Sequence, residues 1–168
     1  QPATTATTSM ANIDAGAKDT KKIFAPVAGE LINIESVSDP TFAQKMMGDG
    51  AAIIPTDDHF YAPFDGTVET VFPTKHAIGL KSKDGVELLI HVGIDTVDLK
   101  GAHFTAHVNQ GATVKQGDLL LDADLDAIKA DGYDTTTMLV VTNTKDFVDV
   151  VPNEVTTVDK NAVALYVI

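Results

Sequence analysis

The chain of 168 residues contains neither cysteine nor arginine. Without cysteine it has no disulfide, no thiolate-bound zinc and no thiol nucleophile, a composition compatible with a reducing compartment such as the cytoplasm. Its formal charge of −12 disfavours nucleic acid and anionic membranes as partners, because phosphate groups are bound through clustered basic side chains. The charge favours a basic protein partner instead.

Long apolar runs are also missing, since no segment approaches the ~20 residues that span a bilayer, and direct membrane insertion is not expected. Residues 1–22 have neither the basic start nor the apolar middle of a signal peptide. They are rich in Ala and Thr and predict a flexible tail or interdomain linker, whereas residues 23–168 predict one folded domain. Because the first residue is not Met, we expect a processed end or an excised domain, tethered to a membrane transporter within a longer chain.

Short apolar or alternating runs, separated by Gly, Pro, Asp and Asn, predict an all-β antiparallel sandwich or barrel-like fold. The segments APVAGELINI (25–34) and APFDGTVETV (62–71) share a turn signal before an alternating run, which predicts a duplicated β-motif. The expected strands are 23–25, 29–34, 51–54, 59–62, 66–72, 76–81, 86–92, 104–108, 112–114, 119–123, 137–142 and 162–167.

Two short helices are expected between these strands. Asp39 can cap a helix over 40–47, where Pro40 suits the first position and Gly48 follows the end. Asp124 can cap a second helix over 125–130. Neither helix is long enough to form a helical core.

Two of the five histidines, His76 and His91, lie on strands joined by KSKDG (81–85). A two-residue turn at Asp84-Gly85, or any even-length loop, puts both rings on one face of the hairpin, whereas an odd-length loop puts them on opposite faces. Such a pair could bind a metal, form a nucleophile with its partner, or fill space in the core. Coupling between the rings would keep at least one neutral, with a lone pair available for attack on phosphorus.

The remaining chemical motifs are weaker. DADLDAIKADGY (122–133) lacks the sixth-position Gly and twelfth-position Glu of a calcium loop. A zinc hydrolase needs three protein ligands, commonly His-x-His with a carboxylate, and no His-x-His is present. His59, His103 and His107 are expected to be exposed bystanders.

The strings FAQKMMGDGAAIIPTD, KHAIGL and GVELLIHVGIDTVDLKG, in this order, resemble the glucose-type enzyme IIA domain of the bacterial phosphoenolpyruvate-dependent sugar phosphotransferase system. The resemblance covers about Ile23 to the C-terminus and implies a phosphocarrier. It implies that His91 accepts a phosphoryl group at Nε2 from the phosphocarrier protein HPr and passes it to a cysteine on a IIB domain. It also implies that His76 stabilises the phosphoryl group and that Thr74 and Gly93 orient the two rings.

With no arginine in the chain, positive charge around a phosphoryl group has to come from the partner. We therefore expect an acidic-rimmed apolar docking face, made of Asp39, Phe42, Met46, Met47, Ile78, Leu89, Asp95 and Val97. For the phenylalanine and the two methionines, ordinary core packing is the alternative, which the resemblance disfavours.

No cofactor is expected, although a zinc ion bridging His76 and His91 to a partner's carboxylate stays open. The alternative function is a regulatory module fused to a sugar transporter, whose phosphorylation state controls permeases or metabolic enzymes. Sugar specificity is expected to reside in the membrane-embedded domain of the system.

Overall fold

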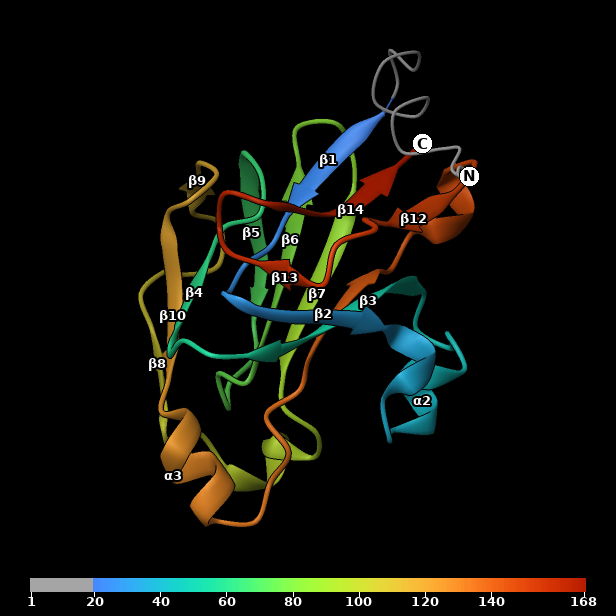
Figure 1. Cartoon of the computed structure of the whole chain (residues 1–168). Helices are drawn as coiled ribbons and strands as arrows, with labels where there is room; N and C mark the ends of the chain where they lie inside the picture. The colour runs from blue at the N-terminus through green and yellow to red at the C-terminus, as the bar shows by residue number, and fades with distance from the viewer. Residues whose placement is uncertain (1–19) are drawn as a thin grey trace.

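The computed structural model describes residues 20–168, and its regular elements are mostly short antiparallel strands (Figure 1). The strands are β1 (Lys21–Phe24), β2 (Gly29–Asn33), β3 (Asp49–Pro55), β4 (His59–Tyr61), β5 (Gly66–Val71), β6 (Ala77–Ser82), β7 (Glu87–Val92), β8 (Phe104–Ala106), β9 (Thr113–Val114), β10 (Leu119–Ala123), β11 (Thr137–Val141), β12 (Val150–Pro152), β13 (Thr157–Val158) and β14 (Val163–Val167). The α-helices are α2 (Pro40–Ala43) and α3 (Leu125–Ala130), and the 3₁₀-helices are η1 (Ile34–Ser36), η2 (Thr96–Leu99) and η3 (Thr144–Asp146).

An eight-stranded sheet with the order β13-β2-β3-β11-β7-β6-β5-β9 forms the centre of the fold, and smaller sheets β1-β14-β12 and β4-β10-β8 pack around it. Neighbouring strands pair antiparallel throughout these sheets. The two copies of the echoed sequence become β2 and β5, which lie second from opposite edges of the large sheet. The all-β antiparallel prediction is confirmed, and the repeat occupies matching places in it.

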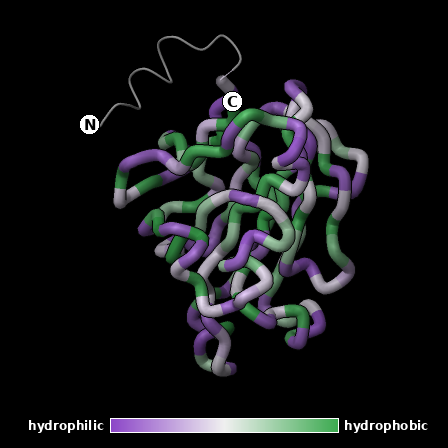
Figure 2. Tube along the Cα trace, turned by 90° about the vertical axis from the view of Figure 1, so that its right-hand side faces the viewer, coloured by the Kyte–Doolittle hydropathy of each residue, from purple (hydrophilic) through white to green (hydrophobic). Residues whose placement is uncertain are grey.

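Apolar residues gather in the interior strands, whereas the outer loops are mostly hydrophilic (Figure 2). Buried residues form two clusters on the two faces of the large sheet. The main cluster includes Ile78, Leu88 and Ile90. The smaller cluster includes Phe42, Ala77 and Leu89. This separation follows from the pleat, because successive residues of a strand point to opposite faces.

Most expected strands are found within one or two residues of their predicted ends, but the short strands β12 and β13 were missed. The expected tail, residues 1–22, lies outside the described residues over 1–19. Strand β1 begins at Lys21, so the last two residues of the expected tail lie in this strand.

Helix α3 has the predicted bounds, with the Asp124 carboxylate accepting a hydrogen bond from the amide of Ala127 at 3.1 Å. The helix expected over 40–47 is wrong in length, because α2 ends at Ala43. Its cap is right, since Asp39 accepts from the amide of Thr41 at 3.0 Å. Lys45 adopts a left-handed φ of 59°, which breaks the helical path and leaves the following methionines in a turn.

Within residues 20–168, no helix has the length and apolar character that a bilayer crossing requires.

Candidate functional site

His91 lies near the end of β7, with its ring partly exposed at one end of the β6–β7 hairpin. Its Nδ1 is 2.8 Å from the carbonyl oxygen of Gly93. A carbonyl oxygen can only accept, so Nδ1 carries the proton and donates it. The outer nitrogen, Nε2, therefore carries the lone pair of the neutral ring.

Gly93 is required by the backbone at this position. Its φ of +81° lies in the left-handed region, and a Cβ there would come within 2.4 Å of Cγ2 of Thr96 and 2.9 Å of the carbonyl oxygen of Asp134. Thr96 is fully buried against this turn. The close packing fixes the carbonyl that holds the ring of His91. Thr96 was missed by the sequence reasoning, because a threonine after a strand gives no signal of burial.

His76 is buried, with 3% of its surface exposed, and lies directly before β6. Its Nδ1 is 2.6 Å from Oγ1 of Thr74, as the sequence led us to expect for these two residues. When the hydroxyl donates this bond, Nε2 of the ring bears the proton and can donate to an anion. The ring of Phe72 packs edge-on against His76, with centroids 5.5 Å apart. Phe72 was not predicted to belong to the site.

The two imidazoles meet edge-on, with ring centroids 4.8 Å apart and an interplanar angle of 81°. The predicted hairpin register is nevertheless wrong. Ala77 pairs with His91 and Lys81 with Glu87, so the loop has three residues, Lys83 to Gly85, rather than an even number.

The rings meet in spite of the odd loop because His76 precedes the strand. Lys75, with a φ of +61°, turns the chain just before it, and the side chain of His76 does not follow the alternation of β6. The His76 carbonyl still accepts from the amide of Val92 at 2.8 Å, which ties this residue to β7. The contact between the rings is thus a product of the turn and not of the strand pairing.

The surroundings of both rings favour their neutral forms. Burial and, to a lesser extent, the neighbouring His91 together lower the pKa of His76 to about 4. Burial also lowers the pKa of His91, which the hydrogen bond to Gly93 and the negative charge of Asp39 partly offset. At pH 7 the site therefore offers two uncharged imidazoles.

Some residues expected to form the docking face are buried, and others are exposed to solvent. Phe42 and Leu89 are buried in the smaller cluster and form the floor of the face, with the Phe42 ring centroid 5.0 Å from that of His91. Met46, Met47 and Val97 are among the most exposed large apolar side chains of the described residues, at 72%, 39% and 49%. Of the two acidic residues, Asp95 is exposed and Asp39 is partly exposed.

Ile78 was assigned to this face wrongly. It is 1% exposed and belongs to the main core, because it pairs with Ile90 and points away from the side that Ala77, Leu89 and His91 share. The residue on the site's side is its neighbour Gly79, which pairs with Leu89. A shift of register by one residue exchanges the two faces of a strand, which accounts for the error.

The other histidines lie away from this pair, and two of them are joined by an aspartate. Asp122 on β10 accepts from Nδ1 of His59 at 2.5 Å and from Nε2 of His107 at 2.7 Å, and we refer to these three residues as the aspartate-bridged cluster. His103 donates separately to Asp131 at 2.7 Å. The three histidines are at least partly exposed, as expected, but each has an acidic partner that was not predicted.

Within residues 20–168, no group of three His, Asp or Glu side chains has the arrangement of a metal site. His76 and His91 can offer two nitrogen ligands, so a zinc ion at the pair would need further ligands from a partner, the arrangement that the sequence left open.

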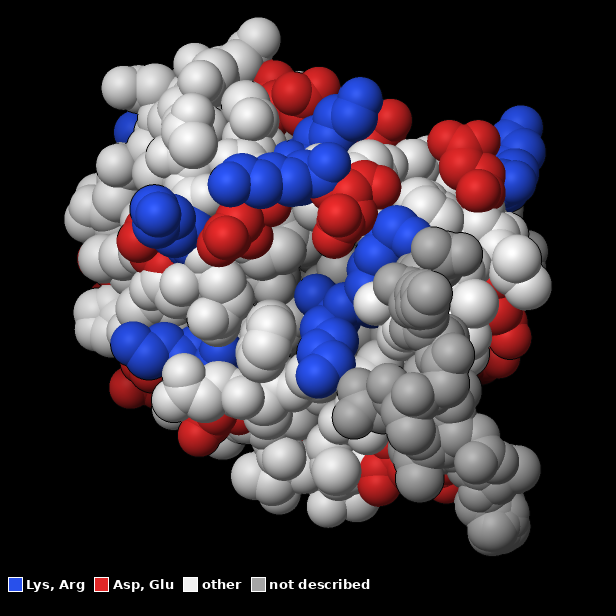
Figure 3. Space-filling model, turned by 90° about the horizontal axis from the view of Figure 1, so that it is seen from above, with Lys and Arg blue, Asp and Glu red and all other residues white. Residues whose placement is uncertain are grey.

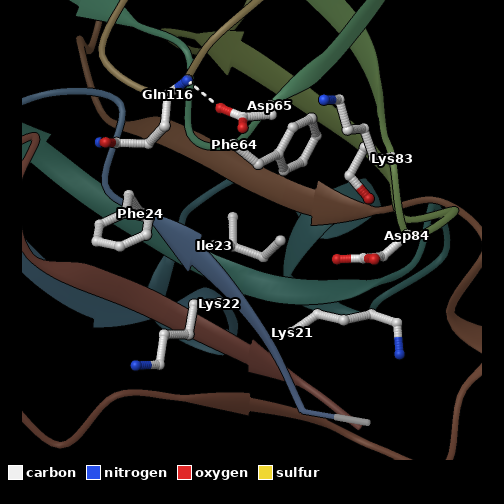
Figure 4. Close-up of a pocket in the computed structure, with 10 residues that line it drawn as sticks. Lys21, Lys22, Ile23, Phe24, Phe64, Asp65, Lys83, Asp84 and Gln116 are labelled. Carbon is white, nitrogen blue, oxygen red and sulfur yellow. Dashed lines mark hydrogen bonds between the residues drawn. The ribbon is translucent and has the colours of Figure 1, made fainter.

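A hollow of about 490 Å³ lies at the opposite end of the β6–β7 hairpin, between β1 and the turn that carries Lys83 and Asp84. The ammonium groups of Lys21, Lys22 and Lys83 point away from one another in it (Figure 4). Basic and acidic side chains are intermingled on this end of the molecule (Figure 3). No histidine lines this hollow, and its lysine side chains do not converge on one point where a charged ligand could bind.

Fold and site together define a class of protein, a mostly antiparallel β domain that presents two neutral histidine rings in contact at one end of a hairpin. Residues 21–147 match the model of the family described as phosphoenolpyruvate-dependent sugar phosphotransferase system, EIIA 1. The chain belongs to this family, and it is an EIIA phosphocarrier that acts through a phosphohistidine.

Individual relatives agree with this assignment. The chain is 54% identical to the beta-glucoside-specific EIIBCA component of Dickeya chrysanthemi over 89% of its own length, but covers only 24% of that relative. It is 53% identical to the glucose-specific EIIA component of Halalkalibacterium halodurans, over 77% of this chain and 75% of the relative. The glucose permease IIA from Mycoplasma capricolum has the same fold, with a TM-score of 0.76 and 36% identity over 88% of this chain and 95% of that one.

Proposed function

We propose that His91 carries the phosphoryl group on Nε2, that it receives the group from HPr, and that it passes the group to a cysteine of a IIB domain. The observation that carries this proposal is the hydrogen bond from Nδ1 of His91 to the carbonyl of Gly93 at 2.8 Å. The bond fixes the proton on the inner nitrogen and turns the lone pair of Nε2 outward, where a docked donor can present its phosphorus.

In the first transfer, the lone pair of Nε2 attacks phosphorus while the bond from phosphorus to the donor's histidine breaks. The ring of His91 gains positive character once Nε2 is bonded to phosphorus, and the Gly93 carbonyl stabilises that charge through the Nδ1 proton. In the second transfer, a thiolate of the acceptor attacks the phosphorus, and Nε2 leaves with its electron pair as a neutral imidazole. Each step exchanges one bond to phosphorus for another and needs no oxidant or reductant.

His76 is proposed to stabilise the phosphoryl group. Its ring lies edge-on to that of His91, and Thr74 can hold Nδ1 as an acceptor so that Nε2–H is available to an anionic oxygen. With its pKa lowered to about 4, the ring donates this hydrogen bond as a neutral group. The phosphoryl charge is then stabilised by hydrogen bonds from this chain and by basic side chains of the partner.

We further propose that the domain works in the cytoplasm beside a sugar permease. Three relatives are named EIIBCA or EIICBA components, in which A, B and C parts are combined. This chain matches 24%, 17% and 18% of their lengths. The sugar is proposed to be glucose or a β-glucoside, the substrates in the names of these relatives.

The test is incubation of the chain with phosphoenolpyruvate, enzyme I and HPr, followed by intact mass measurement and peptide mapping. We expect one acid-labile phosphoryl group on His91 and none in the His91→Ala variant. His59→Ala is the matched control, because His59 also has its Nδ1 held by an acceptor but lies outside the pair. Labelling that survives His91→Ala would refute the assignment.

A further inference from the structure

The carbonyl that holds His91 belongs to the peptide bond between Gly93 and Ile94, and the other end of this peptide bond is held as well. The Gly93 oxygen accepts from Nδ1 of His91 at 2.8 Å. The Ile94 amide donates to the carbonyl oxygen of Asp134 at 3.0 Å. A chain of hydrogen bonds therefore runs from the imidazole through one peptide unit to the loop before β11. Each bond in such a chain polarises the next, which makes the Gly93 oxygen a stronger acceptor.

The backbone that follows His91 forms a turn that needs support from elsewhere in the chain. Gly93 and Asp95 both adopt left-handed φ values, of +81° and 61°, and a residue with a Cβ adopts this conformation at a steric cost. The loop 134–136 supplies support through two hydrogen bonds. Beside the bond from Ile94, the Gly93 amide donates to the carbonyl of Thr136 at 3.1 Å. The position of this loop therefore determines where the Gly93 carbonyl points.

The loop 134–136 is held in turn by the side chain of Asp134. Oδ1 of this residue accepts from the amide of Thr136 at 2.9 Å and from its Oγ1 at 2.7 Å. Asp134 is exposed to solvent, whereas Thr135 and Thr136 after it are buried. The negative charge that acts on the His91 ring is that of Asp39. The carboxylate of Asp134 thus reaches the site through the backbone that it orders.

We propose, on the basis of the function proposed above, that Asp134 is a positioning residue for phosphoryl transfer. Its carboxylate fixes the loop 134–136, and the loop directs and polarises the Gly93 carbonyl toward Nδ1 of His91. This carbonyl matters more during transfer, because the ring gains positive character once Nε2 is bonded to phosphorus. If the loop loosens, the carbonyl holds the Nδ1 proton less firmly. The ring can then adopt the tautomer with the proton on Nε2, which has no lone pair there for phosphorus.

The first test examines the free chain, before any phosphoryl group is added. The hydrogen bond to Gly93 raises the pKa of His91, so a loosened carbonyl should lower it further. In an NMR titration of the ring, Asp134→Ala should lower the pKa of His91 by about half a pH unit. The ¹⁵N shifts of the two ring nitrogens above pH 7 should move toward the tautomer with the proton on Nε2.

The second test measures kcat and KM for transfer from phosphorylated HPr. Asp134→Ala should lower kcat roughly fivefold, as expected for a weakened hydrogen bond, and leave KM unchanged within about twofold. Asp134→Asn keeps the acceptor oxygen and should restore both kcat and the pKa of His91. Asp131→Ala is the matched control, because it removes the same charge from the same connection between α3 and β11. It should change neither quantity.

Thr136→Val tests the loop from its other side. It keeps the shape of the side chain and removes the hydroxyl that donates to Asp134. The pKa of His91 and kcat should change in the same direction as in Asp134→Ala, but less, because the amide of Thr136 still donates to the carboxylate. This variant also decides the matter if Asp134→Ala does not fold, since an unchanged pKa and an unchanged kcat would then refute the proposal.

The remaining outcomes separate this inference from the proposed function. An unchanged His91 pKa in Asp134→Ala would overturn the positioning role. Asp134→Asn as impaired as Asp134→Ala would also overturn it, because the charge and not the hydrogen bonds would then be responsible. A raised KM with unchanged kcat would place Asp134 in docking instead. Failure of the unaltered chain to become labelled would refute the proposed function, while the titration of the free chain would still test the link between Asp134 and His91.

Discussion

The histidine pair and the aspartate-bridged cluster use the same side chain in opposite environments. His76 and His91 are held by a hydroxyl and a backbone carbonyl, and burial lowers both pKa values. His59 is exposed and donates to Asp122, and this hydrogen bond raises its pKa. The same bond is the main reason that the pKa of Asp122 is lowered. Neutral acceptors and burial keep an imidazole uncharged, whereas a carboxylate partner in water favours the imidazolium.

This difference decides which histidines can carry a group. A phosphoryl acceptor has to be neutral, with an exposed lone pair, and His91 satisfies both conditions at pH 7. A phosphoryl group on His59 would also lie near Asp57, Asp58 and Asp122, whose negative charges act on its ring. His59, at the start of β4, is thus suited to binding a proton, whereas His91 in the β6–β7 hairpin is suited to binding phosphorus.

The largest expected difference between the histidine pair and the aspartate-bridged cluster concerns the transfer of the phosphoryl group from His91 to IIB. His76→Gln should still accept a phosphoryl group on His91 but should pass it to IIB about 10²-fold more slowly, because a hydrogen-bond donor to the migrating group is replaced by a longer, flexible amide. Single-turnover quench measurements with the phosphorylated variant test this. His107→Gln is the matched control, and equal rates for the two variants would remove the role given to His76.

A second prediction concerns stability against pH. The pKa of His76 falls from 6.5 to about 4 on folding, so the unfolded chain takes up this proton first as the pH falls. The stability linked to the neutral ring is present above pH 6.5 and is lost as the pH falls through about 4, by up to about 3 kcal/mol. Urea unfolding at pH 7 and pH 4 should show a smaller loss for His76→Gln than for the unaltered chain, since carboxylates common to both cancel in the difference. Parallel losses would contradict the lowered pKa.

The smallest effect is expected in the aspartate-bridged cluster. Asp122→Asn removes the carboxylate that raises the pKa of His59, so that pKa should fall toward 6.5. An NMR titration of the ring protons of His59 measures the change. Labelling of His91 should proceed at the unaltered rate, and a slower rate would show that the two groups of histidines are coupled.

Much of the fold follows from local patterns in the sequence. Alternating runs bounded by Gly, Pro and Asp predicted most strands, and the cap at Asp124 predicted α3 with its observed ends. Strands β12 and β13 were missed, because the segment VVPNEVTTV (150–158) that contains them shows no regular alternation of apolar and polar residues. Helix α2 was predicted too long, since a sequence pattern does not show that Lys45 adopts the left-handed conformation.

The candidate site was predicted in part, and for partly wrong reasons. The contacts of His76 with Thr74 and of His91 with Gly93 were expected, and both are present. The even-length loop that was to bring the rings together is absent, and the one-residue error in register placed Ile78 on the docking face in place of Gly79. Burial and side-chain direction depend on register, which a single turn residue can shift.

The sequence by itself determined an acidic, cysteine-free β protein with two histidines near one hairpin, because composition and alternation are properties of the chain. Only the tertiary structure decided that the rings touch, through the left-handed turn at Lys75 that releases His76 from the alternation of β6. Packing against Phe72 and Phe42 then buried His76 and part of the ring of His91, which lowers both pKa values and favours the neutral forms. Protonation depends on which groups surround a ring, and those groups come from distant parts of the chain.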